Sequence, residues 1–230
     1  ELKIVLSSDM ATLSFGDLDP VAEDNYGGVD GDSTTGFFDD AAHFDVVGFD
    51  AILAFEANVS GITAMASFGV LEETDTAAIA DVSNADAMQL YATGAFGMVS
   101  FEAAYQAAFG AADGDTDHTV FGLSASTTVA GAELTAAYIA NSDNGDLDDI
   151  AESSIGFGVS YPVGPVTLAG YYSLNDVADD AYGVSADYAD GPIAVNAYYE
   201  LAGGVDGVDD DATEFGVEGS YDTGMNLTVL

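Results

Sequence analysis

The stretch VSFEAAYQAAF, residues 99–109, alternates between two kinds of side chain. Apolar side chains stand at every second position, at Val99, Phe101, Ala103, Tyr105, Ala107 and Phe109. The positions between them include the polar residues Ser100, Glu102 and Gln106. Successive side chains of a β-strand point to opposite faces, so this period of two predicts a strand with one apolar and one polar face.

The same alternation recurs along the chain and is bounded by Gly, Asp, Asn or Pro, which are typical turn residues. Residues 49–58, 193–201 and 213–221 show it most clearly. About fourteen strands are predicted in this way. We expect them at residues 2–7, 10–16, 49–58, 62–70, 86–95, 98–109, 118–129, 133–140, 153–161, 166–174, 181–189, 193–201, 213–221 and 225–230.

The connections between these strands alternate in length. Short turns such as Val59-Ser60-Gly61 and Asp190-Gly191-Pro192 are followed by longer acidic stretches, of which residues 17–48 form the longest. An up-and-down antiparallel sheet has this layout, with all short turns at one end and all long loops at the other. We therefore predict an all-β meander in a single domain, residues 1–230.

The composition excludes several classes of protein. One Lys against 41 acidic residues gives a formal net charge of −40, yet 49% of the residues are hydrophobic. Disordered chains combine high charge with low hydrophobicity, so this chain should fold. Nucleic acid is excluded as a partner because phosphate binding needs clustered Lys and Arg. The absence of Cys excludes disulfides and thiolate metal sites.

Charged residues fall on only one face of the predicted strands. They are Lys3, Asp50, Glu56, Glu102, Glu133, Glu152, Asp187, Glu200, Glu214 and Glu218. The opposite face carries Phe, Leu, Ile, Val and Tyr, with aromatic residues near strand ends. A lipid-facing surface must exclude charge, and a sheet in lipid must close on itself to pair its edges. The pattern favours a transmembrane antiparallel up-and-down β-barrel whose charged residues face the lumen.

Three stretches of sequence resemble a known family. Residues 2–17, LKIVLSSDMATLSFGD, read as strand, tight turn and strand, and a long acidic loop follows. Tyr182–Tyr188 and Phe215–Tyr221 look like recurrent Tyr/Phe-Gly-x-x-x-x-Tyr strands. This layout resembles the general diffusion porins of alphaproteobacterial outer membranes. The resemblance implies a homotrimer in outer-membrane lipid, and 16 to 18 strands in all, with the first strands and the last strand or strands missing from this chain.

In that family the corresponding long loop folds into the barrel and narrows the pore. The resemblance therefore implies that residues 17–48 form a constriction loop. Its carboxylates are Asp17, Asp19, Glu23, Asp24, Asp30, Asp32, Asp39, Asp40 and Asp45. The family usually sets such a loop against basic residues, and Lys3 is the only basic side chain available here.

A pore lined by carboxylates concentrates cations and repels anions. We therefore expect a water-filled, cation-preferring channel for passive diffusion of small hydrophilic solutes and ions. No cofactor is required, although acidic loops offer hard oxygen ligands for Ca²⁺ or Mg²⁺. The candidate metal-binding residues are Asp113, Asp115, Asp117, Asp209 and Asp211. Solvated loops without an ordered ion are the alternative.

Signals of an enzyme are poor. His43 and His118 are the only histidines, and no H-E-x-x-H, G-x-S-x-G, P-loop or dinucleotide fingerprint occurs. The alternative from another class is a secreted, acidic, halophilic β-sandwich or adhesin that depends on calcium. It accounts for the charge equally well, but less well for the charge-free face and for the alternating loop lengths.

Overall fold

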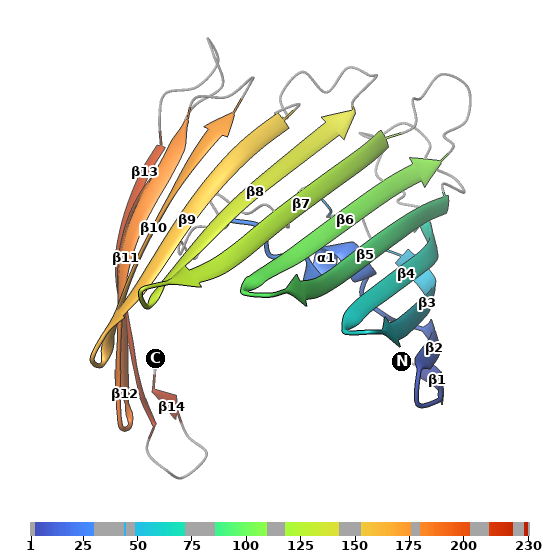
Figure 1. The fold of residues 1–230 in the computed structure, drawn as a ribbon, viewed down its shortest axis with the longest axis horizontal. Coiled ribbons are helices and arrows are strands. Elements are labelled where there is room, and N and C mark those ends of the chain that lie inside the picture. Colours follow the sequence, from blue (N-terminus) through green and yellow to red (C-terminus); the bar gives the residue numbers. More distant parts are fainter. Residues whose placement is uncertain are drawn as a thin grey trace.

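A computed structural model describes most of the chain. The described residues are 3–29, 44, 49–71, 86–109, 118–142, 153–175, 180–202, 212–222 and 228–229. They form one antiparallel sheet of fourteen strands, in which each strand pairs with its neighbours in the sequence (Figure 1). Among these residues no helix is both long and apolar enough to span a membrane.

The strands confirm the predicted all-β meander. Their bounds are β1 Lys3–Ser7, β2 Ala11–Gly16, β3 Phe49–Val59, β4 Ile62–Leu71, β5 Asp86–Phe96, β6 Val99–Phe109, β7 His118–Val129, β8 Ala132–Ser142, β9 Ser153–Val163, β10 Val166–Asn175, β11 Ala181–Asp190, β12 Ile193–Ala202, β13 Ala212–Asp222 and β14 Thr228–Val229. The prediction is close for β1 to β13. Of the predicted strand at residues 225–230 the structure describes Thr228–Val229, which form β14. The expected total of 16 to 18 strands stays a prediction.

Strand β9 continues beyond its predicted end at residue 161. Pro162 lies within the strand and pairs with Thr167 of β10. Strand β8 does not pair with β9 at Pro162, because the pairing of these two strands ends at Glu133 and Ser160. Proline is tolerated at such an edge because the missing N–H removes no bond to a second neighbour.

Two-residue turns join the strands at the short-turn end. Ser60 and Gly61 have φ values of 55° and 83°, and Ala130 and Gly131 have 53° and 87°. Positive φ at both positions defines type I′ turns, whose twist matches that of the paired strands. These turns set the register of the β3–β4 and β7–β8 hairpins.

The two faces of the sheet differ as the alternation predicts over most of each strand. At strand ends the prediction of a charge-free face is wrong, because Asp86 is in register with Phe109 and Asp190 with Ile193, both on the apolar face. Large apolar side chains are exposed on the outer face. Examples are Leu53, Phe55, Leu123, Phe157, Leu168 and Tyr199, which are 40% to 51% exposed. No second sheet covers this face in the part of the chain that is described. A soluble sandwich would bury these side chains, whereas a membrane barrel presents them to lipid.

The inner face of the sheet carries a short helix that the sequence analysis did not predict. Helix α1, Val21–Asn25, lies on the concave side and packs against β4, β5 and β6 (Figure 1). A core forms between it and the wall, and includes Val21, Ala22, Tyr91 and Val120. The main buried cluster therefore lies inside the curve of the sheet.

Candidate functional site

Residues 17–29 fold inward from the end of β2, and we call them the inner segment. They contain α1, which begins after Pro20 and has Glu23 and Asp24 in its first turn. Carboxylates near a helix N-terminus are favourable because of the partial positive charge there. The helix has no side-chain cap of its own. Its first N–H groups therefore need partners from elsewhere.

The wall of the sheet supplies these partners. The backbone N–H groups of Ala22 and Glu23 donate to Oε1 of Gln89 on β5, at 2.7 and 3.2 Å. The N–H of Val21 donates to Oγ of Ser67 on β4, at 3.1 Å. Side chains distant in sequence thus cap the helix and hold it to the wall.

Gln89 also connects the inner segment to the rest of the wall. Its Nε2 donates to the backbone oxygen of Phe44 at 3.1 Å and to Oε1 of Gln106 on β6 at 2.7 Å. Gln89 and Gln106 are each 1% exposed. A buried amide can donate and accept at once, so Gln89 ties Phe44, α1 and the wall together.

Glycines on the inner face make room for the long loop. Tyr26 and Phe44 meet edge to face, with ring centroids 5.2 Å apart, and lie over Gly122 of β7. A Cβ at Gly122 would stand 2.7 Å from the Tyr26 ring, and one at Gly156 of β9 would stand 2.9 Å from Cβ of Val29. Any side chain at these two positions would push the inner segment off the wall.

Glu102 on β6 holds the far end of the inner segment. Its carboxylate accepts hydrogen bonds from the backbone N–H of Gly27 at 3.3 Å, from Oγ of Ser124 at 3.1 Å and from the Tyr91 hydroxyl at 3.3 Å. Glu102 was predicted to face the lumen, and in the structure it also positions the inner segment.

The structure describes four of the nine predicted loop carboxylates. Asp17, Asp19 and Asp24 line a hollow of about 270 Å³ that also contains Lys3 and Glu56, and Glu23 is half-buried on α1. The remaining five lie outside the described residues: Asp30, Asp32, Asp39, Asp40 and Asp45. The single Lys thus lies among carboxylates, and their role in a constriction stays a prediction.

Four of the other predicted wall carboxylates lie on β11, β12 and β13. Asp187 accepts a bond from Nδ2 of Asn196 at 2.7 Å, and Glu214 accepts one from the Tyr198 hydroxyl at 2.6 Å. Glu218 pairs in register with Asn196, on the same face. Glu200 is buried beside Gly183. Asp50 belongs to β3, and its side chain is outside the description.

No described residue tests the predicted divalent-cation sites. Asp113, Asp115, Asp117, Asp209 and Asp211 all lie in ranges outside the description. The ranges that are described hold no group of three or more His, Cys, Asp or Glu placed to bind a metal. The calcium or magnesium expectation stays a prediction.

Sequence reasoning did not identify Ser67, Gln89 and Gln106 as functional. The alternation places all three on the polar face, and Gln89 and Gln106 stand directly opposite each other on β5 and β6. Two opposed amides on an inner wall are the only local sign of the anchor. The sequence does not indicate which groups of the inner segment these side chains bind.

An antiparallel sheet with an outward apolar face and an inward-folded segment has the architecture of an outer-membrane barrel. A model of the Gram-negative porin family matches residues 1–230, and the chain belongs to this family. No match was found among curated proteins.

Solved structures with this fold include other outer-membrane proteins. A triple mutant of the Rhodopseudomonas blastica porin has 22% identity and a TM-score of 0.61, over 96% of this chain and 76% of that chain. Outer-membrane expressed OmpT of Vibrio cholerae has 16% identity and a TM-score of 0.65, over 95% of this chain and 80% of that chain. At sequence identities this low, the similarity to these structures shows that the chain has the same fold.

Family membership decides between an outer-membrane porin and a soluble β-sandwich or adhesin. The chain is a non-enzymatic porin that forms a channel in the bacterial outer membrane and passes solutes. The prediction of a porin is confirmed, and the alternative of a soluble β-sandwich or adhesin is wrong. The apolar side chains of the outer face are exposed because they contact the lipid around the barrel.

Proposed function

We propose that this porin is a cation-preferring channel for small hydrophilic solutes. The observation that carries the proposal is the balance of charge, with 41 acidic residues and one Lys. Carboxylates stand on the inner wall from β3 to β13, among them Glu56, Glu102 and Glu214. A water-filled channel of this charge attracts cations to its mouth and repels anions.

The inner segment is the proposed constriction. It is fixed on the inner face by Gln89 and Glu102, so its exposed carboxylates are held inside the barrel. Asp17, Asp19 and Asp24 are those carboxylates, and Lys3 is their only basic neighbour in the hollow that they share. A negative constriction without an opposing row of Arg would favour any small cation over an anion of equal size.

Ion selectivity tests this proposal directly. In planar bilayers under a KCl gradient, the reversal potential should have the sign of a K⁺-selective channel. The preference should fall as the salt rises, because the screening length shrinks from about 10 Å at 0.1 M to about 3 Å at 1 M. Anion selectivity, or the absence of conductance, would refute the proposal.

The homotrimer is a further part of the proposal and needs its own measurement. The mass of the detergent-solubilised protein, measured by light scattering before and after heating, should fall about threefold if three chains associate. A single chain mass before heating would contradict it.

A further inference from the structure

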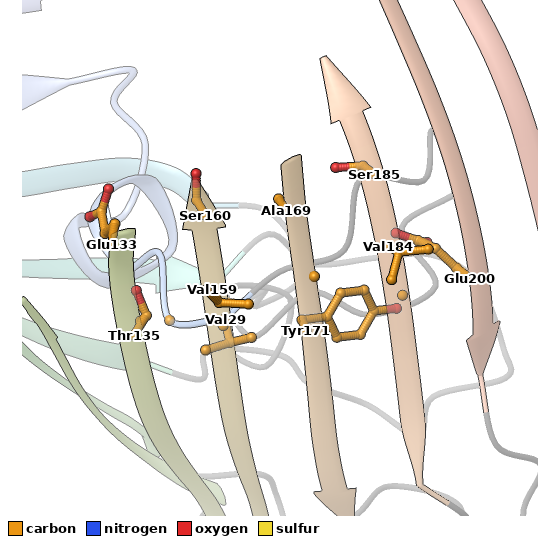
Figure 2. A pocket seen from close by; sticks show the side chains of 14 residues that line it. Val29, Glu133, Thr135, Val159, Ser160, Ala169, Tyr171, Val184, Ser185 and Glu200 are labelled. Atoms are coloured by element: carbon orange, nitrogen blue, oxygen red, sulfur yellow. The ribbon is translucent and has the colours of Figure 1, made fainter. Parts of the chain in front are cut away.

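A second hollow lies in the inner wall beside the end of the inner segment (Figure 2). It has a volume of about 190 Å³, and Gly28 and Val29 form one side. Inward-facing positions of β8 to β12 form its floor. We call it the wall hollow. Its small volume suits a solute of about monosaccharide size.

Two rows of paired residues cross the floor of the wall hollow. The first row runs through Glu133, Ser160, Ala169 and Ser185. The second row runs through Thr135, Gly158, Tyr171, Gly183 and Glu200. Carboxylates therefore stand at the two ends and hydroxyls between them, as Figure 2 shows.

The spacing of the two carboxylates argues against a metal ion as the ligand. Glu133 and Glu200 lie four strands apart, which is about 19 Å along the sheet at a strand spacing of about 4.8 Å. Ligands of one Ca²⁺ lie within about 2.6 Å of the ion. The two carboxylates therefore cannot share an ion, and they mark opposite ends of the wall hollow.

Ser185 is the observation that points to a ligand. Its side chain is 9% exposed and lines the wall hollow, and its Oγ has no hydrogen-bond partner among the described residues. A buried hydroxyl without a partner is unfavourable, so native structures usually satisfy it. A hydroxyl or ammonium group of a solute in the hollow would complete this bond.

Glu200 sets the charge of that ligand. Its side chain is 1% exposed and lines the same end of the hollow as Ser185. Charge attraction is stronger at such a buried site than in bulk water. The only Lys or Arg of the sequence, Lys3, lines the other hollow, beside Asp17. The ligand that suits this end is therefore a cation.

We propose that the wall hollow binds a small organic cation that carries both a primary ammonium and hydroxyl groups, as an amino sugar does. The ammonium has three N–H donors, which suit the carboxylate of Glu200 and the hydroxyl of Ser185. The hydroxyls of the solute point along the first row toward Ser160, two strands from Ser185, whereas Glu133 lies beyond the reach of a solute of this size. The inference rests on the proposed function, because such a solute reaches the hollow through a cation-accepting pore.

Calorimetric titration of the detergent-solubilised full chain with glucosamine tests the site without relying on conductance. Glucosamine should bind saturably at one site per chain, and neutral N-acetylglucosamine should bind at least about tenfold more weakly. Glu200→Gln should weaken glucosamine binding about tenfold or more. Asp190→Asn, which neutralises an exposed carboxylate outside the hollow, should leave it within about twofold.

Ser185→Ala provides a second test and decides the question if Glu200→Gln does not fold. It should weaken binding about threefold or more. Unsaturable binding, or equal affinity in the wild type and either folded variant, overturns the proposal. Reversal potentials measured on the same preparation separate the two claims. Cation selectivity without saturable glucosamine binding refutes the wall site alone, and saturable binding without cation selectivity refutes only the proposed ion preference.

Discussion

Replacing Gln89 by Leu should release the inner segment from the barrel wall. Leu removes both polar atoms of the Gln89 amide. The substitution deletes the acceptor for Ala22 and Glu23 N–H and the donor to Phe44 and Gln106, four hydrogen bonds of 2.7 to 3.2 Å. The inner segment would then depend on Ser67, Glu102 and the apolar contacts.

The magnitude follows from the groups left without partners. Each buried polar group without a partner costs about 1–3 kcal/mol. Gln89 bonds to three backbone groups, the N–H of Ala22, the N–H of Glu23 and the oxygen of Phe44, so docking should weaken by about 2–4 kcal/mol after partial relaxation into pore water. Because about 1.4 kcal/mol corresponds to a factor of ten, the undocked population should rise about 30- to 700-fold.

Hydrogen exchange of peptides covering residues 18–29 measures this population. In Gln89→Leu the amides of Ala22 and Glu23 should exchange about 30- to 700-fold faster, while strand amides of β7 to β12 keep their rates. The matched control is Thr63→Val, which removes the exposed 2.6 Å bond to Asn58 on the same inner wall. Unchanged exchange in Gln89→Leu would refute the anchoring role.

Three further predictions concern packing, turns and the lipid face. Gly156→Ala should narrow the pore and lower single-channel conductance by pushing Val29 from the wall into the lumen, whereas Gly158→Ala, whose added Cβ would have its nearest neighbour 3.7 Å away, should leave the conductance unchanged. Ala130→Gly relieves a φ of 53° and should raise stability in urea refolding into lipid by up to about 1 kcal/mol. Leu123→Arg on the outer face should lower that stability by about 2–4 kcal/mol. The first prediction is contradicted if the conductance of Gly156→Ala is unchanged. The second is contradicted if Ala130→Gly loses stability, and the third if Leu123→Arg leaves the stability unchanged.

Strand positions and the faces of the sheet could be predicted from the sequence. The alternation of VSFEAAYQAAF is a local property, because a strand has a period of two wherever it occurs. Turn residues such as Ser60-Gly61 and Ala130-Gly131 mark where the chain reverses, so strand order and register follow from neighbours in the sequence. Pro162 is an exception, since its place in β9 depends on where β8 stops pairing.

The anchoring of the inner segment was decided only by the tertiary structure. Helix α1 has five residues and no cap of its own, so its sequence carries little helical signal. Gln89 reaches the N–H of Ala22 across 67 positions, and Ser67 reaches that of Val21 across 46. Alternation places Gln89, Ser67 and Gly156 on the inner face, but not against any particular partner. The sequence by itself determined a barrel with a charged lumen, because side-chain alternation is local, whereas the fit of the loop to the wall depends on contacts that exist only once the sheet has curved.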